Sequence, residues 1–300
     1  MAKKSPYHIL KSKWKSRHRK TKAKLLKKHK EAITWINENV PDKQKVASAA
    51  IGALMLTSTL PVSTQIVSQI KSDKELSQTV ESPNSKEELA KLLATQLPQN
   101  VSALTSEEEE TIAKTLSWSF KIPVSATLEG KRLNRSYGLI GAEQHLTRYP
   151  GDTMATHLSP ELASDRFIFS SGMAPGRGAW GYFTNSKANL GQKDIEREKW
   201  YIATQTFLAP GFSENVDDIR HWFKYRKMLV VNPKNGRAVV TDIADAGPAE
   251  FTGKHLGGSP EVMYVLGLHM GPRKGPVLYF FIDDPDDKIP LGPINIPQSS

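Results

Sequence analysis

Short apolar segments separated by Gly, Pro and Asn turns follow one another from residue 117 to residue 290. Such segments are typical of the strands of an all-β domain. The clearest pair is Met228–Asn232 and Arg237–Ile243, which a turn containing Asn-Gly joins as expected for a hairpin. The remaining strands are expected at Ser117–Ile122, Ser136–Ile140, Arg166–Phe169, Trp200–Phe207 and Gly275–Ile282. The pattern therefore predicts a mainly β domain.

Helical patterns occupy other parts of the chain. Residues 71–116 are polar and contain two segments that each begin with a capping box, Ser85–Gln96 and Ser106–Leu116. We expect these two helices to belong to a linker that precedes the β domain and holds it away from a membrane. Shorter helices are expected at Asp194–Lys199 and at Ser259–Gly267, the second with a Ser cap, a Pro in its first turn and a Gly at its end.

Charge is distributed unevenly between the first 45 residues and the rest. Residues 1–45 contain 15 Lys or Arg and 3 Asp or Glu, a formal net charge of +12, whereas the other 255 residues contain 26 and 28, a net charge of −2. The β domain therefore lacks the excess of basic residues that nucleic-acid-binding domains need, and no specific nucleic-acid partner is expected. We interpret residues 1–45 as a disordered, cytoplasmic basic tail that can contact anionic lipid.

A long uncharged stretch follows the basic tail. Residues 46–70 contain no Asp, Glu, Lys or Arg, and about 20 apolar residues are enough to cross a bilayer as a helix. The basic residues before the stretch favour a cytoplasmic N-terminus. The preferred interpretation is an uncleaved, single-pass signal anchor in the cell membrane, with the following domain outside the cytoplasm. A cleaved signal peptide and an ordinary helix of a soluble protein are the alternatives.

These observations divide the chain into five parts. They are a basic tail (1–45), a membrane anchor (46–70), a linker with short helices (71–116), a β domain (117–290) and a disordered tail (291–300). The chain contains no cysteine, which excludes disulfides and thiolate chemistry. The Gly-rich segment Gly172–Gly181 lacks the spacing of a nucleotide-binding loop, and no cofactor is expected.

The order of motifs from Met228 to Ile282 resembles that of the rare-lipoprotein-A-like double-psi β-barrel family, which is related to the expansins and to some lytic transglycosylases. In that family a strand is followed by Asn-x-x-Asn-Gly-Arg, a second strand, Asp-x-Gly-Pro, a Ser-Pro helix ending in Leu-Gly, and a closing strand. The matching residues here are Asn232, Asn235, Gly236, Arg237, Asp245, Gly247, Pro248, Ser259, Pro260, Leu266 and Gly267. The resemblance implies a six-stranded double-psi barrel with an N-terminal elaboration, acting on peptidoglycan or another wall glycan.

The resemblance also implies roles for individual residues. Asp245 matches the family's acidic residue and would protonate the glycosidic oxygen of a glycan strand, while the C6 hydroxyl of the substrate attacks. His221 lies near the position of a family histidine that shares the cleft, and would orient substrate or share the proton. Trp180, in the Gly-rich segment, and Trp222 are candidates to stack on sugar rings. The complete set of candidate substrate-binding residues is Trp180, Trp222, Arg237, Glu250 and Ser259.

The sequence departs from the family pattern at two places. Ala246 follows Asp245 where the family often has Arg, and Gly257–Ser259 stands where the family has Asp-Leu-Ser. The second change removes an acidic residue from the expected cleft unless Glu250 or Glu261 replaces it. A non-catalytic peptidoglycan-binding or scaffold module is therefore the alternative to a lytic transglycosylase.

A third interpretation starts from two histidines and an aspartate in the N-terminal part of the β domain. His145, Asp152 and His157 resemble in spacing the zinc ligands of wall-peptide peptidases, and zinc sites use His and carboxylate ligands. No Glu-x-x-His partner follows them. The preferred interpretation assigns no metal, and a zinc-dependent wall peptidase remains the third possibility.

Overall fold

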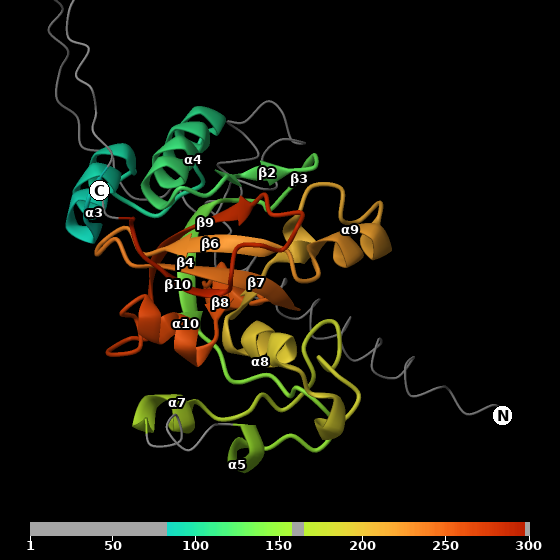
Figure 1. Ribbon diagram of the computed structural model, residues 1–300. Coiled ribbons are helices and arrows are strands. Elements are labelled where there is room, and N and C mark those ends of the chain that lie inside the picture. The colour runs from blue at the N-terminus through green and yellow to red at the C-terminus, as the bar shows by residue number, and fades with distance from the viewer. Residues whose placement is uncertain (1–82, 158–164, 298–300) are drawn as a thin grey trace, which may run out of the picture. The chain divides into compact units, whose positions relative to one another are not determined.

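The computed structural model describes residues 83–157 and 165–297, and within them six strands close into a β-barrel (Figure 1). The order around the barrel is β9-β4-β8-β5-β7-β6, and β6 pairs with β9 to complete the circle. The six strands are β4 (Tyr137–Ala142), β5 (Tyr201–Thr204), β6 (Lys227–Val231), β7 (Ala238–Ala246), β8 (Leu256–Gly258) and β9 (Lys274–Ile282). The prediction of a mainly β domain is confirmed, and the closed barrel is compatible with a double-psi fold.

Most neighbouring strands of the barrel are antiparallel, and two pairs are parallel. The parallel pairs are β4 with β8 and β5 with β7, and the second carries a register shift between Ile202 and Ala203. Two short strands extend the sheet beyond the barrel, β1 (Val124–Ser125) beside β9 and β10 (Gly292–Ile294) beside β7. A separate hairpin joins β2 (Thr127–Leu128) and β3 (Lys131–Arg132).

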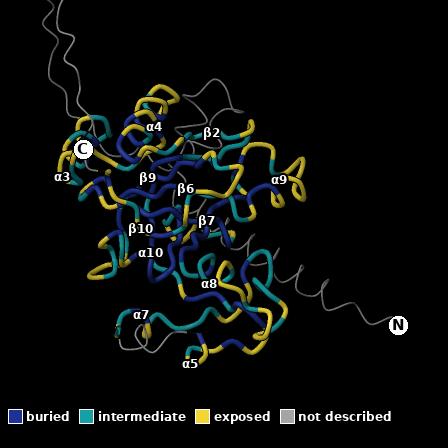
Figure 2. The backbone as a smooth tube through the Cα atoms, viewed as in Figure 1, coloured by how far each residue is buried: buried dark blue, intermediate teal, exposed yellow. Residues whose placement is uncertain are grey.

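Strands β6 and β9 are apolar on both faces because each face meets a different hydrophobic cluster. In β6, Met228 and Val230 belong to one cluster with interior residues of the other barrel strands, whereas Leu229 and Val231 belong to a second. This period of two follows from the alternation of side chains along a strand. Figure 2 shows the barrel strands as the largely buried centre of the described residues.

The second cluster is completed by two helices on the outer face of β6 and β9, α3 (Lys86–Gln96) and α4 (Ser106–Phe120). Leu93 of α3 and Leu116 of α4 are fully buried. These helices are therefore part of the folded body, which corrects the expectation of a spacer for residues 83–116. The predicted anchor at 46–70 and the basic tail lie outside the described residues. In the part of the chain that the structure describes, no helix is long and apolar enough to cross a membrane.

The remaining helices lie in the connections between strands. Ile219 and Phe223 of α9 pack against the interior cluster of the barrel, as do Val262 and Met263 of α10. Figure 1 shows α5 and α7 on the side of the barrel opposite to α4. The bounds are α5 (Met154–His157), α7 (Arg166–Ser171), η1 (Lys187–Asn189), α8 (Gln192–Lys199), η2 (Thr206–Leu208), α9 (Val216–Phe223), η3 (Glu250–Thr252) and α10 (Pro260–Val265).

Two predicted strands are helical in the structure. Residues 117–120 continue α4, whose buried positions recur every three or four residues until Lys121 adopts a left-handed conformation and ends the helix. Residues 166–169 lie in α7, because the carboxylate of Asp165 accepts hydrogen bonds from the amides of Phe167 and Ile168 and caps a helix there. Packing therefore decides the first case, and the Asp165 cap decides the second.

Candidate functional site

Asp245 lies near the end of β7, whereas the sequence predicted it in the turn after that strand. The predicted strand stopped at Ile243, whereas β7 continues to Ala246 and places Asp245 opposite Ala203 of β5. Ala203 also pairs with Gly257 of β8 on its other side. Directly opposite residues share one face of a sheet. Asp245, Ala203 and Gly257 therefore form a row across three strands, on the face opposite to the interior residues Ile202 and Ile243.

The carboxyl group of Asp245 is held by backbone amides. One oxygen, Oδ1, accepts hydrogen bonds from the amides of Ala179 at 2.7 Å and Ala246 at 2.8 Å. Among the described residues no donor reaches the other oxygen, Oδ2. Burial raises the pKa of Asp245, the two amide bonds oppose the rise, and the negative charge of Glu143 adds to it. A half-buried carboxyl with a raised pKa and one free oxygen can hold a proton and transfer it.

Glu143 occupies the other end of this row. It follows β4, and its side chain folds over Gly257: a Cβ atom at Gly257 would lie 2.4 Å from Glu143 Cγ and 2.6 Å from Glu143 Oε1. Lys254 donates a hydrogen bond of 2.8 Å to the same Oε1 atom. Gly257 is the position at which the family pattern has its second acid. Here Glu143 from a different strand places a carboxylate over that glycine.

The Gly-rich segment 172–181 approaches the row of Asp245, Ala203 and Gly257 from the connection between β4 and β5. A Cβ atom at Gly178 would lie 3.0 Å from the carbonyl oxygen of Ala244, so the absence of a side chain lets this segment pass close to β7. Trp180 is half-buried, and its indole nitrogen donates to the carbonyl oxygen of Arg220 in α9 at 3.0 Å. The guanidinium of Arg220 in turn donates to the carbonyl of Ala179. These contacts hold the amide of Ala179 against Asp245.

His145, Asp152 and His157, which the sequence grouped as a possible metal site, do lie together, with Glu198 of α8 as a fourth member. His157 contacts Asp152 through Nδ1 and Glu198 through Nε2, each at 2.8 Å. The ligand atoms of His145, His157 and Glu198 all lie within 4.8 Å of one another. Burial lowers the pKa of His157, but the hydrogen bonds to the two carboxylates outweigh it and raise the pKa to about 9. All four side chains are buried.

Tyr201 lies between this buried group and Asp245. Its hydroxyl donates to the carbonyl oxygen of Gln144 at 2.5 Å. Burial raises the pKa of Tyr201 well above its usual value, and the negative charges of Glu198, Glu143 and Asp245 raise it further. The phenol therefore stays neutral and separates two sets of acidic groups.

No relative was found. In comparisons with protein-family models, curated proteins and solved structures, nothing matched this chain. The fold and the geometry of the residues themselves are therefore the basis for the proposals below.

The structure places His221 and Trp222 on α9, whose Arg220 contacts Ala179 and Trp180 of the Gly-rich segment. His221 is exposed and lines a pocket of about 600 Å³ with Trp222, Lys224 and Arg226. Trp222 is 9% exposed, packs against Phe223 and Phe281, and donates from its indole nitrogen to Glu129 at 2.7 Å. Among the described residues, no hydrogen bond or ion pair joins His221 to Asp245. The role of both residues in substrate binding stays a prediction.

The other predicted binding residues are distributed over the barrel. Ser259 is fully buried, and its hydroxyl accepts from the amide of Val262 and donates to the carbonyl of Lys199. Glu250 is exposed in η3. Arg237 precedes the first residue of β7, so the length of that strand, about 26 Å at 3.3 Å per residue, separates it from Asp245. The structure thus does not bring Arg237 to the acid.

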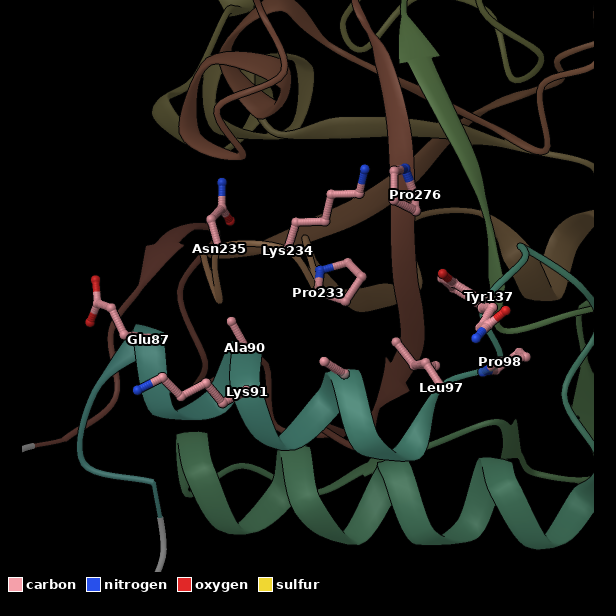
Figure 3. A pocket seen from close by; sticks show the side chains of 12 residues that line it. Glu87, Ala90, Lys91, Leu97, Pro98, Tyr137, Pro233, Lys234, Asn235 and Pro276 are labelled. Carbon is pink, nitrogen blue, oxygen red and sulfur yellow. The ribbon is translucent and has the colours of Figure 1, made fainter.

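A pocket of about 670 Å³ lies between α3 and the turn after β6, near the end of β7 that is remote from Asp245 (Figure 3). Side chains of Ala90 and Lys91 line it from α3, Leu97 lines it just after the helix, and Pro233 and Lys234 line it from the turn. Its position at the opposite end of β7 makes it a feature distinct from the row that contains Asp245.

Sequence reasoning missed two residues of the candidate site. Glu143 lies three residues after the predicted strand Ser136–Ile140. Its position over Gly257 could not be recognised without knowing that β4 pairs with β8. Glu198 lies in the predicted helical turn Asp194–Lys199. Most residues of that turn are charged, so the sequence did not show that Glu198 is the buried one.

Proposed function

We propose that this chain is an exported cell-wall protein whose β-barrel cleaves peptidoglycan or a related wall glycan as a lytic transglycosylase, with Asp245 as its general acid. The observation that carries the proposal is the state of Asp245. Its carboxyl is half-buried, one oxygen is fixed by amides of Ala179 and Ala246, the other oxygen is unoccupied by donors of the described residues, and its pKa is raised. A fixed carboxyl with a raised pKa and one oxygen free for substrate has the features of a general acid.

The motif order from Met228 to Ile282 supports the substrate class. The closed six-stranded barrel is the architecture that the resemblance to double-psi wall proteins implies. The loss of the family's second acid at Gly257 is offset in space by Glu143. A negative charge near the acid raises its pKa, and carboxylates also stabilise the oxocarbenium-like transition state of glycosidic cleavage.

The reaction that fits one acid is an intramolecular transfer. Asp245 gives its proton to the glycosidic oxygen as the bond from that oxygen to C1 breaks. The C6 hydroxyl oxygen of the same sugar forms the new bond to C1, and the hydroxyl proton returns to the Asp245 carboxylate. The products are an anhydro-sugar end and a free hydroxyl end, and Asp245 is regenerated. A second carboxylate acting as nucleophile is not needed.

The experiment compares the full-length protein with Asp245→Asn and with Asp286→Asn, a matched change at an exposed carboxylate. Each is incubated with insoluble peptidoglycan, and soluble products are identified by mass spectrometry. Asp245→Asn should release anhydro-sugars about 10²–10⁴-fold more slowly, the range for a positioned acid, with unchanged binding to the sacculi. Equal cleavage by wild type and Asp245→Asn would remove Asp245 from the mechanism. Binding without any cleavage by the wild type would instead indicate a scaffold module, and cut peptides would indicate a peptidase.

We also propose that the chain is anchored in the cell membrane by residues 46–70, with residues 71–300 outside the cytoplasm and the basic tail available to anionic lipid. The support is the +12 charge before an uncharged stretch of membrane-spanning length. A reporter enzyme that works only in the cytoplasm, fused after Ser300, should be inactive, and one that works only outside it should be active. The reverse result contradicts this topology.

A further inference from the structure

Four buried polar side chains from four separate segments lie close together beside the barrel. His145 follows β4, His157 ends α5, Glu198 lies in α8 and Glu261 lies in α10. Their exposed fractions are 0%, 7%, 2% and 6%. Buried polar groups in folded proteins are almost always hydrogen-bonded, so each one without a partner calls for an explanation.

Two atoms of this group have no partner. Nδ1 of His145 and Oε2 of Glu261 are buried and make no hydrogen bond. The other ring nitrogen of His145, Nε2, faces the carbonyl oxygen of Ile168 at 3.3 Å. A carbonyl can only accept, so the neutral ring carries its proton on Nε2 and has a lone pair on Nδ1.

The lone pair on Nδ1 of His145 faces the carboxylates of Glu198 and Glu261. Nδ1 of His145 lies 3.6 Å from Oε1 of Glu198 and 4.0 Å from Oε2 of Glu261. Both distances exceed those of a normal hydrogen bond, and three acceptor atoms facing one another repel. A cation located between them would turn the repulsion into attraction.

The spacing of the acceptor atoms matches a metal ion of zinc size. Ligand atoms at about 2.0 Å from a tetrahedral zinc lie about 3.3 Å apart. Nε2 of His157 lies 2.8 Å from Oε2 of Glu198, and Nδ1 of His145 lies 3.6 Å from Oε1 of the same carboxylate and 4.0 Å from Oε2 of Glu261. One ligand atom from each of His145, His157 and Glu198 can be chosen so that all three lie within 4.8 Å of one another. A divalent ion would displace the proton on Nε2 of His157, and two neutral imidazoles with two carboxylates would then balance its charge.

The surrounding residues fix the orientation of both imidazoles. Asp152 Oδ2 lies 2.8 Å from His157 Nδ1, and the guanidinium of Arg148 donates to both oxygens of Asp152. A carboxylate that accepts from the outer nitrogen of a metal-binding histidine is a regular feature of zinc sites. Asp152, which the sequence suggested as a ligand, therefore lies one shell further out.

We infer that His145, His157, Glu198 and Glu261 form a site for a divalent transition-metal ion, with zinc as the ion that their nitrogen and oxygen atoms fit. The side chains enclose the position, so the ion ties segments together and has no access to a polymeric substrate. His145 also pairs with Met173 at the start of the Gly-rich segment. The ion would therefore brace the segment whose Ala179 amide holds Asp245, whether or not the barrel cleaves glycan.

The test uses the full-length protein in which His8, His18 and His29 are replaced by Gln, so that the basic tail offers no imidazole. The protein is stripped with a chelator, dialysed against zinc chloride and analysed for bound zinc by mass spectrometry. We expect one zinc per chain, a higher melting temperature with zinc than with chelator, and two imidazoles around the ion by X-ray absorption. Absence of retained zinc in the folded protein overturns the inference.

Variants locate the ion. Glu261→Gln keeps the size of the side chain and should abolish stoichiometric binding, and Asp152→Asn should weaken zinc affinity about 10–100-fold. His221→Gln removes an exposed imidazole and should retain one zinc. Full binding by folded Glu261→Gln and His145→Gln places the ion elsewhere and contradicts the site. If these variants do not fold, an absorption spectrum of the parent protein without imidazole nitrogens contradicts it equally.

Discussion

The pKa of Asp245 depends on residues that are remote in sequence. Burial raises it, and the carboxylate of Glu143, itself paired with Lys254 at 2.8 Å, adds a negative charge. A general acid is active while protonated, so the activity falls as the pH rises through its pKa. The alkaline limit of activity therefore reports the pKa of Asp245, to which burial contributes most and the charge of Glu143 adds.

Replacing Glu143 by Gln removes that negative charge and should lower the pKa of Asp245. The alkaline limb of the profile of kcat/KM against pH should then move to lower pH. Lys254→Met leaves Glu143 unneutralised and should move the same limb to higher pH. Shifts in the same direction for both variants would show that Glu143 does not act on Asp245 through its charge.

Individual site residues could be predicted from the sequence only where the signal is local. Asp245 was identified because its motif is local: a strand followed by Asp-x-Gly-Pro. Glu143 could not be identified in this way, since it reaches Gly257 only through the parallel pairing of β4 with β8. The unpaired atoms of His145 and Glu261 depend in the same way on tertiary packing.

At the scale of elements, the turn between β6 and β7 can approach α3 closely because it has a glycine, Gly236, at the contact. Gly236 has a φ of +66°, and a Cβ atom there would lie 2.0 Å from the carbonyl oxygen of Lys86. Gly271 has a φ of +68° with no atom within 4 Å of such a Cβ. The two glycines thus share a left-handed conformation and differ only in their surroundings.

Gly271→Ala should lower the free energy of unfolding by about 1–2 kcal/mol, the cost of the left-handed conformation for a residue with a Cβ. Gly236→Ala should cost clearly more, because the methyl group also displaces α3. Urea unfolding of both variants measures the difference. Equal costs would mean that α3 does not rest against this turn in solution.

Elements with strong local signals were predicted well. The capping box at Thr105 forms as expected. At Ser85 only the N-cap half forms, because Glu88 accepts from the amide of Asn84 instead of that of Ser85. The hairpin of β6 and β7 follows its Asn-Gly turn. The predicted strands at 117–122 and 166–169 were wrong, because short apolar runs fit a helix as well as a strand. The choice between them depended on packing against β6 and β9 and on the cap at Asp165.

At the scale of the whole molecule, helices α3 and α4 determine where the folded unit begins. Residues 77–300 form one compact unit, and Leu89, Leu93, Ile112 and Leu116 are fully buried in its second hydrophobic cluster. A fragment of residues 77–300 should therefore unfold in a single cooperative thermal transition. A fragment of residues 117–300 exposes the outer face of β6 and β9 and should lose that transition or aggregate. Cooperative unfolding of the shorter fragment at the same temperature would show that the two helices contribute no stability.

Strand β9 pairs with β4 on one side and with β6 on the other, so that Tyr137 lies opposite Leu278 and Val231 opposite the same residue. Pairings between such distant positions give a fold a high contact order, which slows folding. A chain leaving the ribosome cannot close this barrel until residues 274–282 have emerged, because the gap between β4 and β6 has no other strand to fill it. The barrel therefore stays open until β9 has been synthesised, because, of the strands that the structure describes, only this one pairs with both β4 and β6.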